Sequence, residues 1–142
     1  MARFEITVEI ARPVEEVFAT LADPARLPEW QSSAVEVHAH GPIEPGAHFH
    51  EVRSVMGRRL EGTTEVTEYE PPRLFSVRSA TGPVRFDVRH TLEPSEGGTR
   101  VDVVAEGEAT GALRLAGPMV LRTAEREFRR DFERLKELLE AE

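Results

Sequence analysis

His90 is the residue whose type and neighbours most strongly suggest chemistry. It lies in an alternating segment in which Phe86, Val88 and Leu92 share its side of the chain, as on one face of a strand. An imidazole on such an apolar wall could hydrogen-bond a carbonyl or hydroxyl group of a ligand, or transfer a proton near neutral pH. It could equally be a core histidine bonded to a neighbouring Ser, Thr or main-chain carbonyl. Both interpretations place His90 on the inner face of a sheet.

Glu51 and Arg53 are a second candidate pair. A two-residue turn at Met56-Gly57 would pair Glu51 with Gly62 and Arg53 with Leu60. The residues that this register turns inward are Phe49, Glu51, Arg53, Leu60 and Thr64. Charges there could anchor a polar ligand group or act as acid and base. Because a buried charge is costly without a partner, we favour the interpretation that both lie beyond the helix that covers the sheet and meet water.

Four histidines form two His-x-His pairs, His38 with His40 and His48 with His50. Across a hairpin these pairs would gather four imidazoles, which are ligands for zinc, copper or nickel. The register above places all four on the outer face, with Glu36 as a nearby carboxylate. We therefore expect exposed histidines that hold no metal.

The elements that position these residues follow from the periodicity of the chain. Residues 4–10 alternate as a first strand, and Pro13 begins a helix that ends at Asp23-Pro24, followed by a short helical piece over 24–30. Six further strands are predicted at 34–40, 47–55, 58–69, 73–80, 84–93 and 99–108. Short turns join them into an antiparallel meander. Val35 and Val37 are expected to face the core.

A long final helix is predicted over 118–140, after a bridge at 111–117. Its apolar stripe is Leu121, Ala124, Phe128, Phe132 (or Asp131), Leu135 and Leu139. This helix is the element available to cover the apolar face of the sheet, so the five positions from Leu121 to Leu135 are expected to be buried.

Composition narrows the class of protein. The 142 residues have 39% hydrophobic and 31% charged side chains, which suits one domain spanning 1–142. The absence of cysteine excludes disulfides and thiolate chemistry, and a net charge of −8 disfavours nucleic acid. No apolar run is long enough for membrane insertion, and the N-terminus has no apolar leader, so a cytoplasmic location is expected.

Five short phrases occur in a characteristic order: PVEEVF with LAD (13–18, 21–23), LPEW (27–30), EPPR (70–73), TLEP (91–94) and GGTRV (97–101). Together with the order of elements, they resemble the START-like (SRPBCC) superfamily, and within it the polyketide cyclase/dehydrase-like branch. The resemblance implies an α+β helix-grip fold. In that fold a curved antiparallel seven-stranded sheet wraps around a long C-terminal helix, with two short helices after the first strand. It also implies an apolar cavity between sheet and helix.

The favoured function is binding of a hydrophobic small molecule, such as a lipid, polyketide or aromatic metabolite, in that cavity. Small inward residues favour a cavity over a filled core; they are Gly62, Thr64, Ser79, Ala105 and Gly107. The expected ligand-binding residues are Trp30, Phe49, Glu51, Arg53, Thr64, Phe75, Phe86, His90, Met119, Thr123 and Phe128. No cofactor and no metal are expected.

Two other functions stay open. One is a cyclase/dehydratase-like enzyme in which His90 or Glu51 would transfer a proton. The sequence has no catalytic triad pattern, phosphate-binding glycine loop or paired-carboxylate motif that would specify such an activity. The other is a protein-interaction module, such as a chaperone cofactor or a toxin-antitoxin component.

Overall fold

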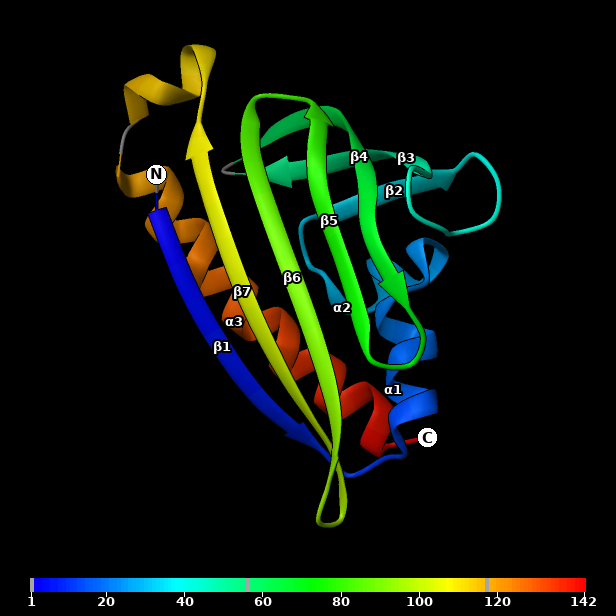
Figure 1. The fold of residues 1–142 in the computed structure, drawn as a ribbon. Helices are drawn as coiled ribbons and strands as arrows, with labels where there is room; N and C mark the ends of the chain where they lie inside the picture. The colour runs from blue at the N-terminus through cyan, green and yellow to red at the C-terminus, as the bar shows by residue number, and fades with distance from the viewer. Residues whose placement is uncertain (1, 56, 117) are drawn as a thin grey trace.

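Seven antiparallel strands form one curved sheet in the order β1-β7-β6-β5-β4-β3-β2, and all helices lie on its concave side (Figure 1). This is a computed structural model, and it describes residues 2–55, 57–116 and 118–142. The strands are β1 Ala2–Ile10, β2 Ala34–Ala39, β3 His48–Val55, β4 Arg58–Glu70, β5 Leu74–Thr81, β6 Val84–Ser95 and β7 Gly98–Ala109. The helices are α1 Val14–Leu21, η1 Pro24–Arg26, α2 Leu27–Trp30, η2 Gly111–Ala116 and α3 Pro118–Glu140. The predicted helix-grip architecture is confirmed.

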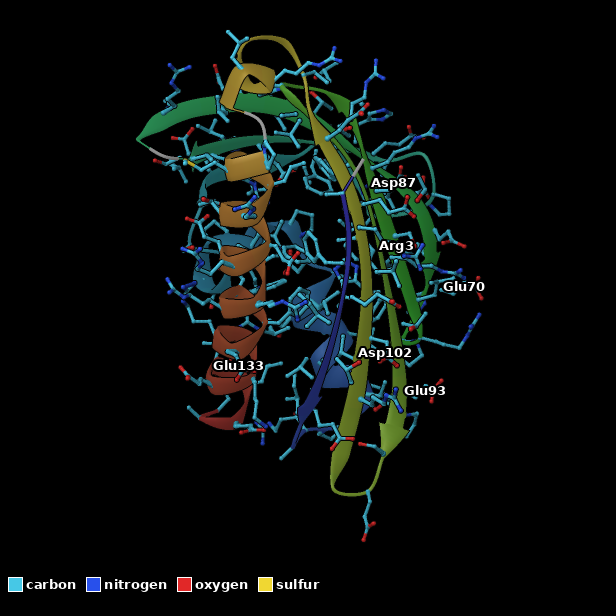
Figure 2. The ribbon with its side chains drawn as sticks, turned by 90° about the vertical axis from the view of Figure 1, so that its left-hand side faces the viewer. Arg3, Glu70, Asp87, Glu93, Asp102 and Glu133 are labelled. Carbon is cyan, nitrogen blue, oxygen red and sulfur yellow. The ribbon has the colours of Figure 1, made fainter. Side chains whose placement is uncertain are left out.

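The hairpin between β3 and β4 has the predicted register. Arg53 pairs with Leu60, Glu51 with Gly62, and Phe49 with Thr64. Met56, the first residue of the predicted turn, is outside the described residues. Because side chains alternate across a strand, this register turns Glu51 toward the helices. Charged side chains such as those of Arg3, Asp87 and Asp102 lie on the opposite, outer face of the sheet (Figure 2).

Strand β2 departs from the predicted alternation at its start. A register shift separates the pairings of Ala34 and Glu36 with β3, which is the pattern of a β-bulge. The bulge leaves Ala34 buried and Val35 46% exposed, so the prediction that Val35 faces the core is wrong. After the bulge Val37 packs against the core as predicted.

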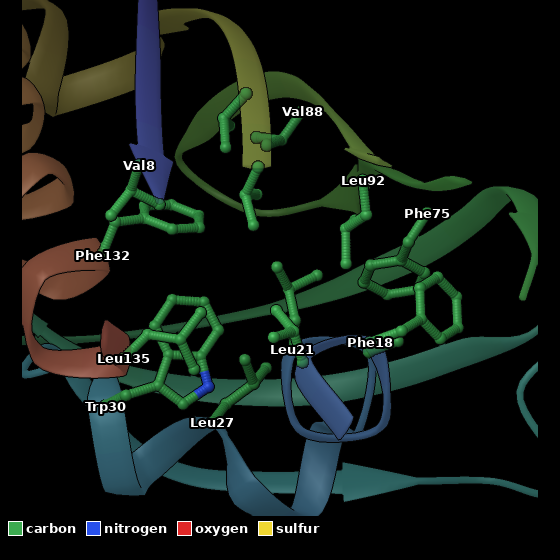
Figure 3. Packing of buried hydrophobic residues seen from close by; sticks show 14 of the residues in the cluster. Val8, Phe18, Leu21, Leu27, Trp30, Phe75, Val88, Leu92, Phe132 and Leu135 are labelled. Atoms are coloured by element: carbon green, nitrogen blue, oxygen red, sulfur yellow. The ribbon is translucent and has the colours of Figure 1, made fainter. Parts of the chain in front are cut away.

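Helix α1 covers the lower end of the sheet in Figure 1 with part of its apolar residues, whereas Ala19 is exposed. Val17, Phe18 and Leu21 of α1 are buried, and Asp23 caps η1 through a hydrogen bond from the Ala25 main-chain nitrogen at 3.0 Å. Figure 3 shows Phe18 near Phe75 of β5, and their ring centroids lie 6.4 Å apart. Helix α1 therefore seals this end.

Helix α3 differs between its two halves. In the C-terminal half Phe132, Leu135 and Leu139 are fully buried, and Phe132 packs on Trp30 of α2 with centroids 5.2 Å apart. In the N-terminal half Leu121 and Phe128 are half-buried and Ala124 is exposed. The prediction of a stripe buried throughout is therefore wrong for Ala124 and holds only in part for Leu121 and Phe128. The reason is that this half faces a hollow, not a packed layer.

Hydrogen bonds fix the C-terminal end of α3 to the end of β1. The Lys136 ammonium donates to the Glu9 carbonyl at 2.6 Å, and the Ala11 main-chain nitrogen donates to the Glu140 carboxylate at 2.9 Å. The C-terminal end of α3 is thus fixed and its apolar face is packed. The N-terminal end extends over the sheet.

Candidate functional site

A cavity of about 280 Å³ lies between the concave face of the sheet and the N-terminal half of α3. The floor is formed by positions with little side chain, including Gly62, Thr64, Ala105 and Gly107. Four aromatic residues form much of the wall: Trp30 from α2, Phe49 from β3, Phe75 from β5 and Phe86 from β6. The small floor residues leave a space that the facing α3 side chains, among them Leu121, Ala124 and Phe128, do not fill.

Nine of the eleven predicted ligand-binding residues line this cavity: Trp30, Phe49, Glu51, Arg53, Thr64, Phe75, Phe86, His90 and Phe128. Met119 and Thr123 are not among its lining residues. Met119 is 62% exposed at the start of α3, beyond the part of the helix that faces the cavity. The α3 residues that do face it are Leu121, Ala124, Glu127, Phe128 and Asp131.

Glu51 is a buried carboxylate whose charge is compensated. It is only 6% exposed, and it accepts hydrogen bonds from Arg53 and from the Thr64 hydroxyl. The Arg53 guanidinium also donates to the Ser33 hydroxyl at 2.9 Å. The interpretation that this pair lies beyond the helices and meets water is therefore wrong for Glu51, because two partners on the same wall replace the water.

His90 is a buried histidine bonded to a main-chain carbonyl, and it also borders the cavity. It is 4% exposed, its Nδ1 lies 2.9 Å from the Phe75 carbonyl oxygen, and it also lines the cavity. A carbonyl can only accept, so Nδ1 carries the proton and Nε2 presents a lone pair. Burial lowers the pKa of His90 to about 4, against the opposing effect of the Phe75 hydrogen bond. The imidazole is therefore neutral at physiological pH.

Asp131 is a cavity residue that the sequence reasoning did not select. Its Oδ1 accepts from the Ser32 main-chain nitrogen at 3.2 Å and from Arg134 at 2.9 Å. Burial raises the pKa of Asp131, and the bonds from Ser32 together with the positive charge of Arg134 partly oppose the rise. The available signal was an acidic residue beside Phe132 on the apolar stripe of α3. Such a residue must find partners from another element.

Polar atoms next to the cavity are not all satisfied. Among the described side chains, those of Trp30 and Gln31 each have a sealed atom without a hydrogen-bond partner, Trp30 Nε1 and Gln31 Oε1. Trp30 and Gln31 belong to the cavity wall, where α2 passes into the connection toward β2. The wall there is held from both sides, because Arg53 bonds Ser33 and Asp131 bonds Ser32.

The sequence profile of a family described as "Polyketide cyclase / dehydrase and lipid transport" matches residues 1–140. The chain belongs to this family. The predicted START-like membership, in the polyketide cyclase branch, is thereby confirmed. Comparison with curated proteins gives no match.

Solved structures share the fold of this cyclase/dehydrase and lipid transport family member at low sequence identity. TTHA0849 from Thermus thermophilus is 18% identical with a TM-score of 0.78, over 99% of this chain and 95% of that one. CV1439 from Chromobacterium violaceum is 17% identical with a TM-score of 0.77, over 97% and 96%. The di-domain ARO/CYC BexL from the BE-7585A biosynthetic pathway is 20% identical with a TM-score of 0.75, over 99% of this chain and 47% of BexL. At these identities the likeness establishes the fold alone.

The four histidines of the first hairpin lie away from the cavity. His38 pairs with His50 across β2 and β3, and the His40 main-chain nitrogen donates to the His48 carbonyl oxygen at 3.4 Å. His38, His40 and His48 are exposed and His50 is half-buried, with its Nε2 3.4 Å from Glu61. In the part of the chain that the structure describes, no three His, Cys, Asp or Glu side chains are placed to hold a metal ion.

No described helix is both long and apolar enough to cross a membrane.

Proposed function

We propose that this protein binds an apolar small molecule in the cavity between the sheet and α3. The observation that carries the proposal is the cavity itself, an apolar space of about 280 Å³ bounded by aromatic side chains. Binding sites for small molecules are typically concave, mostly apolar and provided with a few polar groups. Transfer of apolar ligand surface out of water would stabilise the complex by roughly 25 cal/mol per Å².

The uneven packing of α3 supports the same proposal. Its C-terminal half is close-packed on the sheet, whereas Leu121, Ala124 and Phe128 border open space. Side chains that served only the core would be expected to pack at both ends of the helix. An occupant of the cavity would bury the apolar surface that these residues leave free.

The polar wall gives less support to a cyclase/dehydratase-like reaction. Glu51 is engaged by Arg53 and Thr64, and the lowered pKa of His90 makes the imidazole a weak base. Binding makes no such demand on either group. A binding function is therefore the better account of the wall.

Fluorescence titration with N-phenyl-1-naphthylamine, an uncharged apolar dye, tests the proposal. We expect saturable binding to the wild-type protein. Ala124→Phe should weaken it by about tenfold or more, because the new ring occupies the cavity. Arg126→Phe is the matched control, since Arg126 is exposed and does not line the cavity. Absence of binding, or equal binding by wild type and Ala124→Phe, would refute the proposal.

A further inference from the structure

Acidic residues outnumber basic residues among the charged residues that border the cavity. They are Glu51, Glu61, Glu106, Glu127, Asp131 and Arg53. Glu61 and Glu106 pair with His50 and Arg3 on the outer face, so their carboxylates do not face the cavity. Among the described residues, the inner wall therefore keeps three acidic residues, Glu51, Glu127 and Asp131, and one cation, Arg53.

The one cation is already engaged. Arg53 donates through Nε and Nη2 to Glu51, and through Nη1 to the Ser33 hydroxyl. A carboxylate entering the cavity would have to displace Glu51 from Arg53 or remain uncompensated among acidic groups. Either course is unfavourable in a mostly apolar cavity.

The neutral polar group on this wall is a hydrogen-bond acceptor. Because Nδ1 of His90 donates to Phe75, only the Nε2 lone pair is available to a ligand. No described residue forms a hydrogen bond with Nε2. Nε2 is also not among the fully buried atoms that lack a hydrogen-bond partner, so some of its surface is accessible. It therefore opens on the cavity that His90 lines. A carbonyl oxygen or an ether cannot satisfy this atom, whereas a hydroxyl group can.

We infer that the ligand is an apolar molecule bearing a hydroxyl group, which donates a hydrogen bond to His90 Nε2, and that carboxylates are excluded. This inference rests on the proposed function, and it adds the class of ligand. It also narrows the role expected for His90, because a ligand carbonyl is no longer a suitable partner. The Glu51–Arg53 pair provides the discrimination against anions, and His90 provides the preference for a donor.

Isothermal titration calorimetry at pH 7 with four matched probes tests the inference. The probes are 2-naphthol, 2-methoxynaphthalene, 2-naphthoate and 2-naphthylmethylammonium. We expect 2-naphthol to bind about tenfold more tightly than the methyl ether, which lacks the donor. The carboxylate should show no measurable binding. Measurable binding of 2-naphthoate, or tighter binding of the ether or the ammonium probe than of 2-naphthol, would overturn the inference.

His90→Phe isolates the acceptor. A phenyl ring can keep the contacts of the imidazole with Phe75 and Phe132, whose ring centroids lie 5.6 and 5.8 Å from that of His90. The variant should bind 2-naphthol only as well as it binds 2-methoxynaphthalene, because it has no acceptor for the hydroxyl group. An unchanged preference for 2-naphthol would show that a group other than His90 accepts the hydrogen bond from the hydroxyl.

Glu51→Gln gives a test that loss of folding cannot mimic, because it predicts a gain. The amide can keep hydrogen bonds to Arg53 and Thr64 but no longer neutralises the guanidinium, so 2-naphthoate should now bind. Glu127→Gln is the matched control: it removes one negative charge from the cavity, and Glu127 is not paired with Arg53 in the described structure. Naphthoate binding to wild type, or no gain with Glu51→Gln, would overturn the inference.

The two proposals fail differently. If neither N-phenyl-1-naphthylamine nor any naphthalene probe binds the wild-type protein, the proposed function itself is wrong. If the dye binds and Ala124→Phe blocks it, but 2-naphthol has no advantage over its methyl ether, only the ligand class is wrong.

Discussion

The imidazole of His90 stacks on the ring of Phe75 with centroids 5.6 Å apart, and its Nδ1 lies 2.9 Å from the carbonyl oxygen of the same residue. One neighbour on β5 thus supplies both an apolar contact and a hydrogen-bond acceptor. The pair fixes the ring orientation and the tautomer before any ligand arrives. Burial of the ring, against the opposing effect of this hydrogen bond on the pKa, keeps the histidine neutral in the folded protein.

Acid should destabilise the protein through His90. Its pKa is about 4 in the folded protein against an ordinary 6.5, so the unfolded chain takes up a proton first as the pH falls. Above pH 6.5 His90 is neutral in both the folded and the unfolded state, and its contribution to stability is complete. As the pH falls toward 4, proton uptake by the unfolded chain lowers the free energy of unfolding by about 3 kcal/mol in total. Urea unfolding at intervals across this range should show the loss.

His90→Phe is the control for this titration, because the variant has no group to protonate at position 90. Its free energy of unfolding should depend much less on pH between 6.5 and 4 than that of wild type. The same slope in both proteins would assign the acid sensitivity to other groups.

The face on which His90 and Glu51 lie could be predicted because strand geometry leaves little freedom. A two-residue turn between β3 and β4 fixes every pairing in that hairpin, and the alternation of Phe86, Val88, His90 and Leu92 fixes the inner face of β6. The long helix followed from its apolar stripe. These are local patterns, and local patterns are visible in the sequence.

The rest depended on contacts between distant segments. The burial of Glu51 is tolerable because Thr64, 13 residues away, bonds it directly, and Ser33, 20 residues before Arg53, holds the guanidinium. The bulge that exposes Val35 has no marker in the sequence, where a valine in a strand predicts burial. The half-buried state of Phe128 follows from the small residues opposite it, whose position is known only once the sheet is assembled.

Phe128→Ala should cost less stability than Phe132→Ala. Phe132 is fully buried between Trp30 and His90, so its loss should cost about 3–5 kcal/mol. Phe128 keeps edge contacts with Phe4 and Phe132 but borders the cavity, and its loss should cost clearly less. Paired urea unfolding curves measure the difference. Equal costs would mean that the N-terminal half of α3 is close-packed after all.

The histidine hairpin remains predicted to hold no metal in the purified protein. His38 and His50 have carboxylate neighbours, Glu36 at 4.0 Å and Glu61 at 3.4 Å, which can interact with the imidazoles on the exposed surface without an ion. Elemental analysis of protein prepared without metal-affinity resin should find less than stoichiometric zinc, copper and nickel. A stoichiometric metal that disappears when His40 and His48 are both replaced by alanine would contradict this prediction.

Asp131→Asn should change the pH dependence of stability in the direction opposite to His90→Phe. Burial raises the pKa of Asp131 above its ordinary 3.8, so the unfolded chain loses this proton at a lower pH than the folded protein does. As the pH rises through that interval, ionisation in the unfolded state lowers wild-type stability, and the neutral amide removes the effect. The amide oxygen can still accept from Ser32 and Arg134. The stability of Asp131→Asn relative to wild type should therefore increase from pH 4 to pH 7 in urea unfolding. A decrease would show that Arg134, Arg53 and Ser32 outweigh burial and that the folded protein favours the charged carboxylate.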